Sequence, residues 1–122
     1  MSAIIEIPLG GASYQMRPEW TVYRNVEARL KFPIPELLNL LQAQRITQAE
    51  AATLIQEASR AAGDALDQEA IERCLFEARF VSNPEIMGPL FRLLLALLNG
   101  PEKAAKKFEA EVEPILETMA TI

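Results

Sequence analysis

The chain has 122 residues, half of them hydrophobic and about a quarter charged, so one domain with its own core is expected. Its 17 acidic and 12 basic residues give a formal net charge of −5, which argues against a nucleic-acid binder, because phosphate contact needs clustered lysine and arginine. The chain has no histidine and one cysteine, so most metal, redox and hydrolytic sites lack their usual residues. We therefore expect no metal, no cofactor and no enzyme activity.

The first predicted element is a β-hairpin over residues 3–16. Its turn is Gly10-Gly11, a dipeptide that accepts positive φ without steric cost. Apolar residues alternate on the first strand, and two more are placed to pair across from them: Ile5, Ile7, Leu9, Tyr14 and Met16. Pro8 cannot donate to the ladder, so its nitrogen is expected to face solvent. Pro8 and Glu6 also interrupt the apolar run, and no basic segment precedes it, so it does not read as a secretory signal.

Two helices are predicted next. Pro18 is expected to open the first, because a missing N–H costs nothing in the first turn of a helix. Its apolar positions recur at helical spacing: Trp20, Tyr23, Val26 and Leu30. The second is short and apolar on nearly all sides, so we expect it to be central; its leucines are Leu37, Leu38, Leu40 and Leu41. We expect Trp20 and Tyr23 to pack the hairpin onto the bundle, although exposed they would be typical interface residues.

The third and fourth helices have clear capping signals. Thr47 and Glu50 form a predicted capping box, and Gly63 is the expected stop of the third helix. Its apolar face is Ala51, Leu54, Ile55 and Ala58. Asp67 is the predicted N-cap of the fourth helix, with Leu66 and Ile71 at staple positions. The inner stripe of the fourth helix is Ile71, Cys74, Leu75 and Ala78.

The fifth helix, from Pro84 to Asn99, is the most hydrophobic, and Arg92 is its only charge after Glu85. Gly88-Pro89 predicts either a kink or a helix that begins at Pro89. Its longest apolar run is far shorter than the ~20 residues that cross a bilayer, so no membrane association is expected. The segment 101–122 is amphipathic again, and Pro114 is expected to break or kink it. We therefore predict an α+β fold, mostly α: an N-terminal β-hairpin packed on a bundle of five to six helices. Residues 1–100 form the hairpin and helical core domain, and residues 101–122 form a C-terminal amphipathic helical tail.

No group of residues predicts catalysis. The carboxylate pairs Glu69/Glu72 and Glu109/Glu113 fall on helix faces that the pattern leaves exposed, whereas acid–base chemistry needs a desolvated carboxylate. Cys74 lies on an apolar stripe about two turns into its helix, with no base and no helix N-terminus beside it in the sequence, so a buried structural cysteine is favoured over a nucleophile. Gly10-Gly11 lacks the lysine and hydroxyl of a phosphate loop. Three lysines near residue 105 are better explained by intrahelical pairs than by an acidic partner.

The order of elements resembles the small tail-assembly proteins of phages and gene transfer agents. In that family a strand pair leads into a helix, then a leucine-rich helix, a capped helix ending in Ala-Gly, a helix with an acidic start and a final leucine-rich helix. The matching segments here, within residues 3–100, are Tyr14–Trp20, Val26–Leu30, Leu37-Leu38, Glu57–Gly63, Leu66–Glu69 and Leu90–Leu98. The tail after Gly100 departs from the compact pattern and reads as an added partner-binding segment.

The resemblance implies a tail assembly chaperone that coats the hydrophobic tape-measure protein and hands over tail-tube subunits before polymerisation. It implies no catalytic residues. The expected partners are therefore the tape-measure and tail-tube proteins, with a homo-oligomer also possible, and the expected location is the cytoplasm of a bacterial host. The resemblance also covers proteins labelled as tail-tube components, which would be associated with the virion.

The surplus of apolar helix surface gives the candidate contact residues. They are Leu94, Leu97 and Leu98 on the fifth helix and Phe108, Ile115 and Leu116 on the tail. The competing interpretation is that these side chains belong to the core, which we favour for Leu94. Two other functions stay open: a structural subunit of the tail that pairs through its hairpin, and a small ligand-binding helical domain. Whether the tail folds onto the core is also open.

Overall fold

The computed structural model describes residues 4–100, 106 and 108–120, and these form a two-stranded hairpin and six α-helices. The hairpin consists of β1 (Ile5–Leu9) and β2 (Ala12–Met16). Around it lie α1 (Trp20–Leu30), α2 (Ile34–Gln42), α3 (Gln48–Ala61), α4 (Gln68–Glu77), η1 (Phe80–Ser82), α5 (Pro84–Asn99), the π-helical turn η2 (Phe108–Val112) and α7 (Glu113–Ala120). The predicted fold class, mostly α with an N-terminal hairpin, is confirmed.

The hairpin forms in the predicted register. Ile7 pairs with Tyr14 and Ile5 with Met16, and both glycines of the two-residue turn have positive φ, 58° at Gly10 and 84° at Gly11. Those angles fit a type I′ turn, whose closing pair exchanges hydrogen bonds. Because hydrogen-bonded and non-hydrogen-bonded pairs alternate along the ladder, the nitrogen of Pro8 points away from β2.

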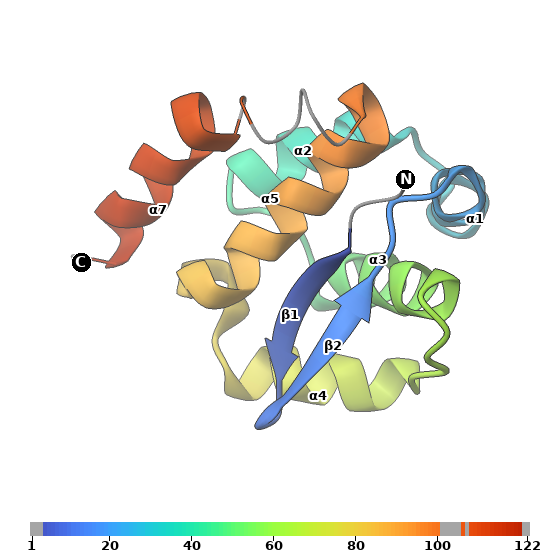
Figure 1. Ribbon diagram of the computed structural model, residues 1–122. Helices are drawn as coiled ribbons and strands as arrows, with labels where there is room; N and C mark the ends of the chain where they lie inside the picture. The colour runs from blue at the N-terminus through green and yellow to red at the C-terminus, as the bar shows by residue number, and fades with distance from the viewer. Residues whose placement is uncertain (1–3, 101–105, 107, 121–122) are drawn as a thin grey trace.

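One face of the hairpin packs on the helices. β1 lies against α5 and α4, and β2 lies against α3, so the hairpin crosses the middle of the molecule in Figure 1. The side chains that face the helices are fully or nearly fully buried: Ile7, Leu9 and Met16. Because a lone hairpin is only marginally stable in water, this packing is what holds the two strands.

The helix α3 is the centre of the bundle. All four residues of its predicted apolar face, Ala51, Leu54, Ile55 and Ala58, are 0% exposed. The alanines let its neighbours approach closely, and α1, α4 and β2 all pack on it. The predicted capping box is present: Glu50 N–H donates to Thr47 Oγ1 at 3.1 Å, and Thr47 N–H donates to Glu50 Oε1 at 2.8 Å.

The capping box gives the first testable prediction. Thr47→Ala removes the hydroxyl oxygen that accepts from Glu50 N–H at the start of α3 and leaves the backbone bond from Thr47 N–H to Glu50, so the free energy of unfolding should fall by about 0.5–2 kcal/mol. Urea denaturation measures this change, with Thr21→Ala, an exposed threonine in α1, as the matched control. Equal stability of the two variants would contradict a stabilising cap.

The first helix begins later than predicted. It starts at Trp20, with Glu19 as an N-cap residue in extended conformation, and not at Pro18. In the preceding segment, Arg17 N–H donates to the Ala58 carbonyl of α3 at 3.0 Å, and Glu19 N–H donates back to the Arg17 carbonyl at 3.1 Å. Within the helix, Val22 and Val26 face the core and the Trp20 side chain is exposed.

The fifth helix runs unbroken through Pro89, so of the two predicted alternatives the later start at Pro89 is wrong. Asn83 caps it by accepting a hydrogen bond from Glu85 N–H at 3.0 Å. Most of its apolar side chains are buried beneath β1, α2 and α7. No helix within the described ranges has both the length and the apolarity needed to cross a membrane.

Candidate docking surface

The structure separates the six predicted contact residues. Leu94 is 0% exposed, so it is a core residue of the folded chain, while Leu97 and Leu98 are half-buried at the end of α5. On the tail, Leu116 is buried against the bundle and Ile115 is 44% exposed. The backbone of Phe108 lies in η2, but its side chain lies outside the described residues.

A hollow of about 370 Å³ lies between α2, α5 and α7. Its walls are mostly apolar and its rim is uncharged: Leu41, Gln42, Gln44, Met87, Phe91, Ile115 and Thr118. Of the predicted contact residues whose side chains the structure describes, only Ile115 lines it. Leu41, Met87 and Phe91 lie below the surface of the hollow, since each is at most 1% exposed, and Ile115 is its exposed apolar side chain. The lining is mostly apolar, which is the composition of a groove that binds a helix.

The tail helix forms one wall of this hollow because it packs against α5 (Figure 1). Among the tail side chains that the structure describes, Val112 of η2 and Leu116 of α7, spaced i and i+4, are buried, at 3% and 8% exposure. The burial of two such side chains contributes at most about 3–6 kcal/mol before ordering costs. A helix of eight residues does not hold its shape alone in water, so α7 is helical because it is docked.

Pro114 lies in the first turn of α7, directly after the π-helical turn η2. A proline disrupts a helix interior because its ring collides with the carbonyl four residues earlier. The predicted disruption is a change from the wider π-helix of η2, which ends at Val112, to the α-helix α7, in which Pro114 is the second residue.

Trp20 was expected to fasten the hairpin to the bundle, and this expectation is wrong. Its side chain is 70% exposed, and the Arg24 guanidinium lies 4.7 Å from its ring centroid. Val22 and Val26 face the core, so the apolar stripe of α1 is rotated away from Trp20. An exposed tryptophan stacked by an arginine is typical of interface residues, as the alternative interpretation allows.

A second exposed aromatic, Phe76, was not singled out from the sequence. It is 69% exposed on α4 and lies between two shallow hollows of about 390 Å³ and 270 Å³. Gln48 lines both hollows, and the larger one extends to Phe80 in η1. The sequence signal was available, because Phe76 falls outside the stripe formed by Ile71, Cys74, Leu75 and Ala78.

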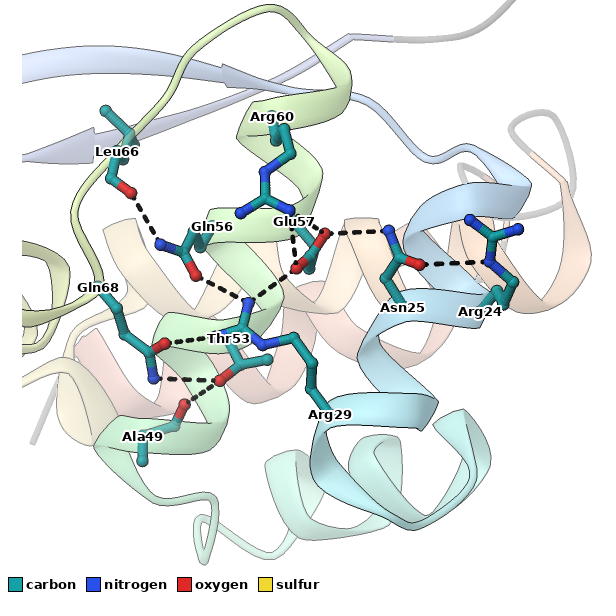
Figure 2. Close-up of polar contacts among 10 residues, drawn as sticks. All are labelled: Arg24, Asn25, Arg29, Ala49, Thr53, Gln56, Glu57, Arg60, Leu66 and Gln68. Carbon is teal, nitrogen blue, oxygen red and sulfur yellow. Dashed lines mark hydrogen bonds and ion pairs between the residues drawn. The ribbon is translucent and has the colours of Figure 1, made fainter.

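A buried carboxylate of α3 is bound by side chains of α1 and of α3 itself, and sequence analysis missed it. Glu57 of α3 is 4% exposed, and Figure 2 shows side chains from two helices converging on it. Its Oε2 accepts from Arg29 Nη1 of α1 at 2.8 Å, and its Oε1 accepts from Asn25 Nδ2 at 3.2 Å. Arg60 Nη1 lies 3.4 Å from both oxygens.

Arg29 extends this contact to the start of α4. Its Nη1 also donates to Gln56 Oε1 at 2.7 Å, and its Nη2 donates to Gln68 Oε1. Gln68 Nε2 in turn donates to Thr53 Oγ1 at 3.3 Å, which completes a polar clasp of α1, α3 and α4 (Figure 2). The carboxylate is satisfied by groups of its own chain, so the clasp is structural.

The other candidate chemistry is dispersed. Glu69 pairs with Arg73 at 3.1 Å on the surface, and Glu109 and Glu113 are exposed. Cys74 is half-buried, and the tip of the hairpin rests on it: a Cβ on Gly10 would lie 3.0 Å from its Sγ. Within the described part of the chain, no three histidine, cysteine, aspartate or glutamate residues lie where they could hold a metal ion.

Comparison with protein-family models, with curated proteins and with solved structures finds no match to this chain.

Proposed function

We propose that this protein is a tail assembly chaperone of a phage or gene transfer agent. It acts in the host cytoplasm by binding, not by catalysis, and its partner is an apolar helical segment of the tape-measure protein, which it keeps covered until the tail-tube protein polymerises. The order of elements supports the proposal, because it is the order on which the resemblance to small tail-assembly proteins rests.

The observation that carries the proposal is the hollow between α2, α5 and α7. Leu41, Met87 and Phe91 lie below its surface, and its rim is formed by glutamine and threonine side chains without charge. A tape-measure helix is long and apolar on one side, so it needs an apolar groove in which that side does not pack against charged side chains. The net charge of −5 would keep the complex soluble while apolar surfaces are being covered.

Gln42 offers a test of this binding site. It is the exposed last residue of α2 and lines the hollow, so Gln42→Arg places a charge at the rim without disturbing the core. Since a cation suits the end of a helix, folding should be unchanged while tape-measure binding falls by about tenfold or more. The tagged variant is expressed in source cells during particle production, and mass spectrometry quantifies the retained tape-measure protein.

Asn39→Arg is the matched control, because Asn39 is an exposed residue one turn earlier in the same helix and does not line the hollow. It should retain as much tape-measure protein as the wild type. If the wild-type chain retains none and is found in finished particles, the chaperone proposal fails.

A second candidate function, a structural subunit of the tail, is favoured by one observation. The hairpin is a two-stranded sheet, and Ala12, Ser13 and Gln15 of β2 are exposed, so another strand could pair along β2. Formation of rings or tubes by the purified protein alone would favour this function over the chaperone.

A further inference from the structure

One amphipathic helix, the tail of the same chain, already packs on α5 beside the hollow. Val112 and Leu116 of the tail are buried, and Ile115 stands between them at the wall of the hollow. These three residues follow the i, i+3 and i+4 spacing of a helix that binds a groove through one side. The tail is therefore an example of an amphipathic helix that binds this face of α5.

An open hollow of about 370 Å³ lies beside the tail, and Phe91 of α5 and Ile115 of α7 both line it. The helix has eight residues and follows a π-helical turn, and its outer side carries the exposed acidic residues Glu113 and Glu117. A helix of eight residues undocks at a lower free-energy cost than opening of the core.

We infer that α7 is an intramolecular competitor: it covers the face of α5 beside the hollow until an amphipathic helix of the partner displaces it. The inference rests on the proposed function for the identity of that partner, a helix of the tape-measure protein with apolar residues at i, i+3 and i+4. The apparent affinity for such a helix is then reduced by the fraction of molecules in which α7 is docked. Loosening α7 raises the affinity, and fixing it abolishes binding.

The first test uses a fluorescein-labelled peptide of the tail's own sequence, Phe108–Ala120, as the competing helix and the full-length protein as the receptor. Leu116→Ala removes one of the buried contacts of α7, so fluorescence anisotropy should give about tenfold tighter peptide binding than the wild type. Glu117→Ala, on the exposed side of the same helix, should bind like the wild type. Equal affinity of all three proteins, or no binding to any of them, would overturn the inference.

The second test fixes α7 in place without weakening it. Gln44 on the α2 side and Thr118 on α7 line the same hollow, so cysteines at both positions can be bridged by a bismaleimide. Cys74→Ala in this variant removes the natural thiol. The bridged protein should lose peptide binding, whereas the same variant without the reagent should keep it. Retained binding after bridging would place the peptide elsewhere and contradict the inference.

The same variants separate this inference from the proposed function when tape-measure protein is recovered from cells. More tape-measure protein on Leu116→Ala than on wild type supports both. If Leu116→Ala tightens binding of the tail peptide but no tape-measure protein is recovered, the competitor role of α7 stands and the chaperone function is rejected. If tape-measure protein is recovered in equal amounts on both proteins and the tail peptide binds neither, the chaperone function stands and the competitor role is rejected.

Discussion

Replacing Leu94 with alanine is expected to lower the free energy of unfolding by about 2–5 kcal/mol. Leu94 is 0% exposed in the middle of α5, where removal of its side chain leaves a cavity that the surrounding helices fill only partly. Because a domain of this size is typically stable by only about 5–15 kcal/mol, the loss is a large fraction of the total. Urea denaturation of the full-length protein measures it.

Leu97→Ala is the matched control in the same helix, because Leu97 is half-buried near its end and should lose only about 1 kcal/mol. The pair distinguishes the two interpretations of the leucine-rich helix. A Leu94→Ala variant with normal stability and impaired partner binding would show that Leu94 is a contact residue. That result would contradict the interpretation of Leu94 as a core residue.

Arg29→Met is expected to destabilise the protein by about 2–3 kcal/mol. Arg29 provides the shortest contact to the buried Glu57 carboxylate, 2.8 Å, and its removal leaves that charge with only Asn25 and Arg60. Breaking a fully buried pair costs roughly 3–5 kcal/mol, and we expect less here because the Arg29 side chain is 34% exposed. Thermal or urea unfolding measures the change.

The matched control is Arg73→Met, which breaks the exposed pair with Glu69 and should cost at most about 0.5 kcal/mol. In the double variant Arg29→Met/Glu57→Gln the uncompensated charge is gone, so part of the lost stability should return. If both arginine variants lose the same amount, the clasp is no stronger than a surface pair.

The sequence predicted those features that depend on residues close together in the chain. The capping box of Thr47 and Glu50 and the N-cap of Asp67 follow from local hydrogen bonding, and both are present. The register of the hairpin follows from its two-residue glycine turn and from alternation. The apolar face of α3 was also correct in full, because four apolar positions at helical spacing leave one way to bury them.

Features that depend on distant segments were missed. Periodicity placed Trp20 on the inner side of α1, but the side of α1 that packs on the core carries Val22 and Val26, and the contact with the distant α3 sets that side. Glu57 was passed over because a glutamate on a helix is usually solvated, and its partner Arg29 lies 28 positions away. The candidate surface was found only at Ile115, because its other walls come from α2 and α5.

The hairpin also limits how copies of this chain could polymerise. A ring or tube built by strand addition requires each subunit to offer two different edges, one to each neighbour. The outer edge of β1 includes Pro8, which has no amide proton to give to a new strand, whereas β2 presents Ser13 and Gln15. Strand pairing through this hairpin alone would therefore stop at two copies joined along β2. In a tail tube, such pairs would have to be linked to one another through other surfaces of the molecule.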